Sequence, residues 1–84
     1  MPHSRKRPRY KSTLRIRNVV VRGHRTSVRL ETVMWDALQE IAAAQGMNVN
    51  QLVTRIKRSG GQSSLTSAIR VYIVEFYHSA ARDG

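Results

Sequence analysis

Two arginines and a serine in residues 25–30 (RTSVRL) are the side chains in this sequence best suited to binding chemistry. An arginine guanidinium donates hydrogen bonds in pairs, which suits a guanine edge or a phosphate, and a serine hydroxyl can add a contact. Arg25, Ser27 and Arg29 stand two residues apart, which is the period of a half-buried β-strand. We therefore expect a strand that turns these three side chains outward as a base-contacting surface.

The basic residues are concentrated at the N-terminal end of the chain. The 84 residues carry a formal net charge of +10; residues 1–30 hold ten basic and no acidic residues, and the charges of residues 31–84 cancel. A basic segment on a near-neutral body is typical of a polyanion binder, with a solubilising tail as the alternative. Residues 1–12 show no apolar periodicity, so we predict a disordered basic arm in which Lys11 contacts DNA phosphates.

Catalytic and metal chemistry find no support in the sequence. Cysteine is absent, and the three histidines have no metal-ligand spacing. Asp36 and Glu40 are interpreted as solvated surface acids, and the glycine-rich linker 59–63 lacks the lysine of a phosphate-binding loop. We predict no enzyme activity, no cofactor and no metal. No apolar run approaches the ~18 residues of a membrane span, so we expect no membrane partner and a cytoplasmic, nucleoid-associated location.

The segment before the strand is rich in β-branched residues and is predicted to be extended over residues 13–23. Arg15, Arg17 and Arg22 in this segment are predicted to contact phosphates. Gly23 suits a bend, but the link lacks the Asn-Gly type of turn signal. The sequence therefore leaves open whether residues 14–21 fold back on 25–30 as a hairpin or run on into it.

Three helices are predicted after the strand. The first has its apolar stripe at Trp35, Leu38 and Ile41 and ends at Gly46, which is suited to a left-handed stop. The second covers about 49–58 behind the capping residue Asn48. The third, from Ser64 or Thr66 to about Ser79, has the cleanest amphipathic pattern, and residues 81–84 are predicted to be a tail.

The start of the second helix is a candidate phosphate site. Its first backbone N–H groups, at Asn48, Val49 and Asn50, can bind an anion without any basic side chain. An ordinary capped helix is the alternative interpretation of the same residues.

The order strand (RTSVRL), helix (VMWDALQEIAAAQ), Gly-Met-Asn turn and helix (VNQLVTRIKR) resembles the ribbon-helix-helix family of dimeric DNA-binding proteins. Extended through the third helix, the chain looks like a bacterial subgroup of that family. The resemblance implies a mainly α fold with one β-strand per chain, in which two chains pair their strands into an antiparallel ribbon that enters the DNA major groove. Thr26 departs from the pattern, because the family usually has a larger apolar residue there.

The resemblance also implies the roles of the remaining residues. Arg25, Ser27 and Arg29 would contact bases, the helix start at Asn48–Asn50 would hold the backbone, and residues 24–80 would form the domain of an intertwined homodimer, with a higher assembly on DNA as an option. The dimer core would comprise Val28, Leu30, Trp35, Leu38, Ile41, Leu52, Val53 and Ile56.

Three functions fit these observations. The first is a transcriptional regulator that binds specific double-stranded DNA. The second is an antitoxin whose third helix binds a protein partner, and the third is an RNA-binding protein that uses the basic arm.

Overall fold

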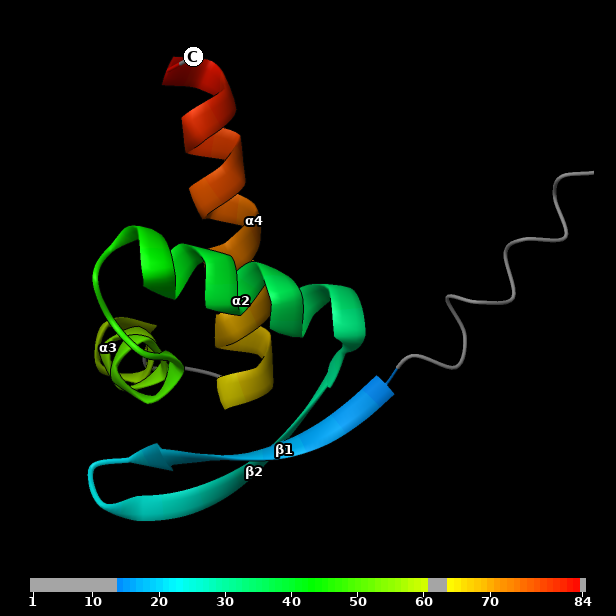
Figure 1. The fold of residues 1–84 in the computed structure, drawn as a ribbon, viewed down its shortest axis with the longest axis vertical. Coiled ribbons are helices and arrows are strands. Elements are labelled where there is room, and N and C mark those ends of the chain that lie inside the picture. The colour runs from blue at the N-terminus through cyan, green and yellow to red at the C-terminus, as the bar shows by residue number, and fades with distance from the viewer. Residues whose placement is uncertain (1–13, 61–63, 84) are drawn as a thin grey trace, which may run out of the picture.

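A two-stranded antiparallel ribbon and three helices make up the computed structural model, which describes residues 14–60 and 64–83. The elements in chain order are β1 (Leu14–Val21), β2 (His24–Glu31), α2 (Thr32–Ala44), α3 (Val49–Gly60) and α4 (Leu65–Asp83). The ribbon lies along one side of the molecule and the helices lie on the other (Figure 1). The basic arm predicted for residues 1–12, with Lys11, lies outside the described residues.

The ribbon is a hairpin formed by one chain. Its strands pair from Val21 with His24 at the turn to Leu14 with Glu31 at the open end. Arg22 and Gly23 make the turn with φ angles of 53° and 81°, and two positive φ values match the right-handed strand twist, as in a type I′ turn. The structure differs from the expected single strand per chain, because β1 folds back and pairs with one edge of β2.

One face of this hairpin is buried and the other is exposed. Val19 and Val21 of β1, with Val28 and Leu30 of β2, are at most 5% exposed and pack under the helices. Thr26, the position that departs from the family pattern, is half-buried opposite Val19, and this valine completes the apolar layer at that end. The outward face carries the three polar side chains that the alternation of residues 25–30 predicts.

The residues expected in the dimer core lie together in one hydrophobic core of the single chain. They are 0–3% exposed there, so the chain buries them without a second copy. β1 supplies the second strand from the same molecule, and Ile69 and Ile73 of α4 complete the same core cluster. The eight residues concerned are Val28, Leu30, Trp35, Leu38, Ile41, Leu52, Val53 and Ile56.

The connection between α2 and α3 follows from its sequence. Gly46, at φ 70°, takes the left-handed position after α2, and its N–H donates to the carbonyl of Ala43 while the N–H of Met47 donates to that of Ala42. These two bonds satisfy carbonyls that the helix end leaves free. Asn48 then caps α3, because its Oδ1 accepts from the N–H of Gln51 at 2.8 Å while Gln51 Oε1 accepts from the N–H of Asn48 at 2.9 Å.

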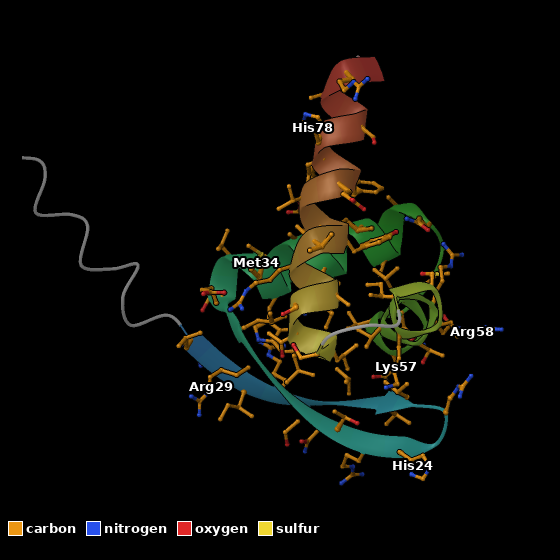
Figure 2. The ribbon with its side chains drawn as sticks, turned by 180° about the vertical axis from the view of Figure 1, so that it is seen from behind. His24, Arg29, Met34, Lys57, Arg58 and His78 are labelled. Carbon is orange, nitrogen blue, oxygen red and sulfur yellow. The ribbon has the colours of Figure 1, made fainter. Side chains whose placement is uncertain are left out.

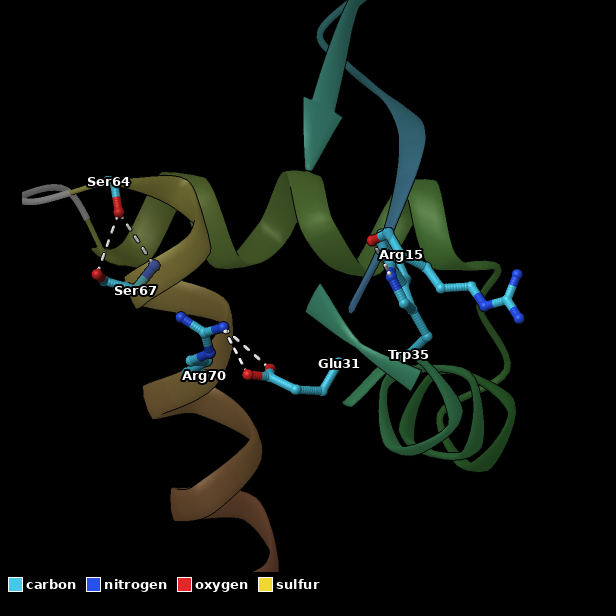
Figure 3. Close-up of polar contacts among 6 residues, drawn as sticks. All are labelled: Arg15, Glu31, Trp35, Ser64, Ser67 and Arg70. Carbon is cyan, nitrogen blue, oxygen red and sulfur yellow. Dashed lines mark hydrogen bonds and ion pairs between the residues drawn. The ribbon is translucent and has the colours of Figure 1, made fainter. Parts of the chain in front are cut away.

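α4 begins with a serine cap and continues beyond the core. Ser64 Oγ accepts from the N–H of Ser67 at 3.1 Å, so Ser64 rather than Thr66 is the cap (Figure 3). The helix packs on the core through its first half and then extends past α2 (Figure 1). It ends at Asp83, so residues 81–83 are helical rather than a tail. None of the helices among the described residues has the length and apolar character needed to span a membrane.

Candidate nucleic-acid interface

The outward face of the ribbon brings together the three residues predicted to contact bases. Arg25, Ser27 and Arg29 are all exposed on β2, and Figure 2 shows Arg29 on the side of the ribbon away from the helices. At the middle of the face, Ser27 Oγ donates a hydrogen bond to Asn18 Oδ1 of β1 at 2.9 Å. This bond fixes the amide of Asn18 beside the hydroxyl, so the centre of the face can both donate and accept hydrogen bonds.

Positive charge dominates the ribbon. Residues 14–30 contain five arginines and no acid. The first acid of the chain, Glu31, accepts two hydrogen bonds from Arg70 Nη2 of α4, at 2.9 and 3.2 Å (Figure 3). The hydrogen bond from Arg70 holds the pKa of the Glu31 carboxyl below its usual range. The carboxylate at the end of the ribbon is thus paired with a cation and adds little negative field to the arginine face.

A cleft of about 280 Å³ joins β1 to the start of α3. It is lined by Arg17, by the helix start at Asn48–Asn50 and by Gln39, among others. The guanidinium of Arg17 lies 5.4 Å from the centre of the Trp35 ring, a cation–π contact that holds the charge over the cleft. The structure therefore brings together Arg17 and the three residues of the α3 start, which the sequence assigned to phosphate binding from two separate segments.

The groups available at this helix start differ from those expected. The N–H of Asn48 is occupied by Gln51, and the Oδ1 of Asn50 accepts from the N–H of Val20 in β1 at 3.0 Å. The backbone N–H groups of Val49 and Asn50 stand in the first turn, where a helix leaves its donors free. An anion in the cleft would therefore be bound by these two donors together with Arg17, rather than by all three backbone groups.

A second basic hollow, of about 310 Å³, lies at the hairpin turn. Arg22 and His24 line it from the ribbon, and Lys57 lines it from α3. Figure 2 shows Lys57 reaching from α3 toward the turn, whereas Arg58 points away from the ribbon. Arg22 was predicted to contact phosphates, but Lys57 was not, because only the tertiary structure places the second half of α3 beside the turn.

Arg15 stands apart from both hollows. Its backbone carbonyl accepts a hydrogen bond from the Trp35 indole N–H at 3.1 Å, and its guanidinium extends away from the body (Figure 3). Trp35 is 2% exposed, as expected for a core residue. The contact of Arg15 with phosphate stays a prediction.

Three residues of the outward face were not predicted from the sequence: Asn18, Ile16 and Val20. The alternation of residues 14–21 could have assigned them to this face, but only if a two-residue turn at Arg22 and Gly23 set the pairing of the two strands. The turn has arginine rather than asparagine at its first position, so the usual Asn-Gly turn signal is absent.

Taken together, these features define a class of protein in which a basic two-stranded ribbon is carried on a helical body, with a helix start beside it. A profile of the ribbon-helix-helix domain matches residues 14–77, and the chain belongs to this family. Domains of this family are in general DNA-binding regulators or antitoxins rather than enzymes, and they typically bind DNA as dimers.

One solved structure resembles this chain closely. It is that of an uncharacterized protein from Bordetella pertussis Tohama I, with a TM-score of 0.74 and 34% sequence identity over 89% of this chain. The match spans 64% of the length of that protein. Comparison with curated proteins gives no match.

Proposed function

We propose that this chain is a transcriptional regulator of bacterial type that binds specific double-stranded DNA by laying the outward face of its ribbon in the major groove. The observation that carries the proposal is the exposed row of Arg25, Ser27 and Arg29 on a ribbon without acids in residues 14–30. A two-stranded ribbon fits a groove about 12 Å wide, and each arginine matches the paired acceptors of guanine. A cytoplasmic location on the nucleoid goes with this function.

Phosphate contacts on both sides of the ribbon would fix its register. Arg17 and the start of α3 would form one phosphate-binding site, and Arg22 and Lys57 at the turn would form the other. Contacts of this kind orient a protein on the duplex without carrying sequence information. Lys11 and the other basic residues of the first twelve add charge that would follow the backbone further.

We also propose that the regulator acts as a homodimer, with a higher assembly on DNA as a further step. A groove of about 460 Å³ between α2 and α4 supports this, because it is lined mainly by apolar side chains, including Val33 and Ile73. Val33 and Val74 are 62% and 59% exposed. This surface is one candidate for contact between copies, and the edge of β2 that β1 leaves unpaired is the other.

An antitoxin is the second candidate, because a protein partner could use the same exposed side of α4. The packing of α4 favours the regulator: Ile69 and Ile73 are buried in the chain's own core, so most of this helix is not a free partner-binding segment. Co-purification with a small protein encoded next to this one would favour the antitoxin.

The test is selection of duplexes from a random pool, followed by affinity measurements on the R25A/R29A variant. We expect this variant to lose at least about thirtyfold of its preference for the selected duplex, at ~1 kcal/mol or more of discrimination for each bidentate contact. The matched control is R58A/R82A, which removes the same charge from the helices. Both variants should keep their circular dichroism spectra.

Two outcomes would overturn the proposal. One is an R25A/R29A variant that still selects the same duplex over random DNA. The other is a wild-type protein that prefers RNA to duplex DNA in direct competition, which would favour RNA binding through the basic segment.

A further inference from the structure

The outward face of β1 carries aliphatic side chains where a half-buried strand normally has polar ones. Ile16 is 57% exposed and Val20 is 39% exposed, whereas Arg15 and Arg17 occupy the alternate positions on the helix side. Alternation in a two-faced sheet usually puts apolar residues against the core. The inverted pattern in β1 gives no packing benefit within the chain, so it indicates a surface that is covered when the protein works.

The register sets each of these residues beside a residue of β2 already assigned to bases. Residues opposite one another in an antiparallel ribbon project from the same face with Cβ atoms ~4.5–5.5 Å apart. In the central part of the outward face, an arginine with a branched aliphatic residue therefore lies on either side of an amide with a hydroxyl, and the pair of Leu14 with Glu31 follows at the open end. The opposed residues are Ile16 with Arg29, Asn18 with Ser27, and Val20 with Arg25.

We propose that Ile16 and Val20 contact the C5-methyl groups of thymines beside the guanines that Arg29 and Arg25 address. The thymine methyl is the apolar group that a major groove presents to a protein, and small apolar side chains are its usual partners. On this face the aliphatic residues lie beside arginines, and residues 14–30 contain no acid. Two copies of such a face would repel each other, so a nucleic acid is the better partner for it than a second copy of the chain.

This inference rests on the proposed function and refines it in one respect. Each chain would provide a complete reading ribbon with two different strands, β1 for methyl groups and β2 for guanine edges. Ile16 and Val20 are four residues apart, which is ~13 Å along a strand. At ~3.4 Å per base pair, the two thymine–guanine elements should lie about four base pairs apart in one groove.

The experiment replaces each thymine of the selected duplex, one at a time, with deoxyuridine. This change removes only the methyl group and keeps the base pair. We expect wild-type protein to lose about fourfold in affinity at two positions in the part of the site bound by each chain, and nothing at the other positions. Fourfold is the value for losing burial of one methylene-sized group. In I16S the penalty should disappear at the position next to the guanine read by Arg29, and in V20S at the other.

V71S is the matched control, because Val71 is an exposed valine of α4 that lines neither the groove between α2 and α4 nor the two hollows beside the ribbon. It should keep both deoxyuridine penalties. Melting temperature and sedimentation of all three variants check that fold and oligomeric state are unchanged.

The two hypotheses fail in different ways. If wild-type protein selects a duplex through Arg25 and Arg29 but tolerates deoxyuridine everywhere, the methyl contacts are refuted and the proposed function stands. If I16S or V20S dissociates a dimer and lowers affinity equally for every duplex, the face joins copies of the chain, and the inference is also refuted. A wild-type protein without duplex preference overturns the proposed function itself.

Discussion

The side chain of Asn50, in the first turn of α3, accepts a hydrogen bond from the backbone N–H of Val20 in β1 at 3.0 Å. The bond joins the helix start, where a phosphate would bind, to the strand edge of the ribbon. Because the side chain of Val20 lies on the outward face, this bond helps to set the spacing between base contacts and phosphate contacts, together with the packing of β1 on α3.

Replacing Asn50 should separate stability from DNA binding. N50D keeps the acceptor and adds a negative charge near the positive end of α3, so it should be as stable as wild type or more stable by ~0.3–1 kcal/mol. The same charge repels a phosphate, and duplex affinity should fall roughly tenfold. N50A loses the bond and should unfold ~0.5–1.5 kcal/mol more easily. Urea unfolding and fluorescence anisotropy measure the two effects, and an N50D variant with normal affinity would argue against a phosphate at this helix start.

The cleft beside β1 predicts a contact that is independent of sequence. R17Q removes the guanidinium over Trp35, so it should weaken binding to all duplexes to the same degree and reduce the slope of log affinity against log salt by ~0.9. Loss of the cation–π contact should also destabilise the fold by ~0.5–1 kcal/mol. R58Q is the control, since Arg58 points away from the ribbon (Figure 2). A salt titration in which both variants keep the wild-type slope would remove Arg17 from the interface.

The hairpin turn holds the backbone of Arg22 in an unfavourable conformation. Arg22 has φ 53°, a left-handed value that costs most residues roughly 1–2 kcal/mol and asparagine less. R22N should therefore stabilise the fold by up to ~1 kcal/mol in urea unfolding. G23A should destabilise it by about the same amount: Gly23 has φ 81°, and an added Cβ would meet no atom within 4 Å, so the loss is backbone strain alone. Equal stability of R22N and wild type would show that the turn relaxes in solution.

The ion pair between Glu31 and Arg70 predicts a pH dependence of stability. The pKa of the Glu31 carboxyl is lowered in the folded state, chiefly by the hydrogen bond from Arg70. A carboxyl with a depressed pKa contributes stability above its unfolded pKa of ~4.3, and the contribution is lost as pH falls through the folded value. The two side chains are 40% and 36% exposed, so solvent screening keeps the effect below ~1 kcal/mol.

Thermal melts between pH 6 and pH 3 test this contribution. E31Q should show a shallower fall in melting temperature below about pH 5 than wild type. D36N is the control, because it removes an exposed carboxylate of α2 that lies away from this pair. Identical profiles for E31Q and wild type would mean that the pair contributes nothing in solution.

Local sequence patterns predicted most of the helical part of the fold. The left-handed stop at Gly46, the cap at Asn48 and the cap at Ser64 are formed by side chains or backbone within a few residues, so the sequence was enough to place them. The apolar stripe of α4 was also predicted, and it is buried or half-buried through Phe76. Tyr77 is more exposed, because the helix continues past the body at that point.

The ribbon was predicted in kind but not in its pairing. The sequence determined that residues 25–30 form a strand with Arg25, Ser27 and Arg29 on one face, because alternation is a local property. Which strand would pair with it depended on whether Arg22 and Gly23 form a two-residue turn, which their residue types do not signal. In the fold, β1 also packs against α3. Only the folded chain decided that β1 is the partner, that Arg17 meets the start of α3, and that Ile16 and Val20 share the outward face with the arginines.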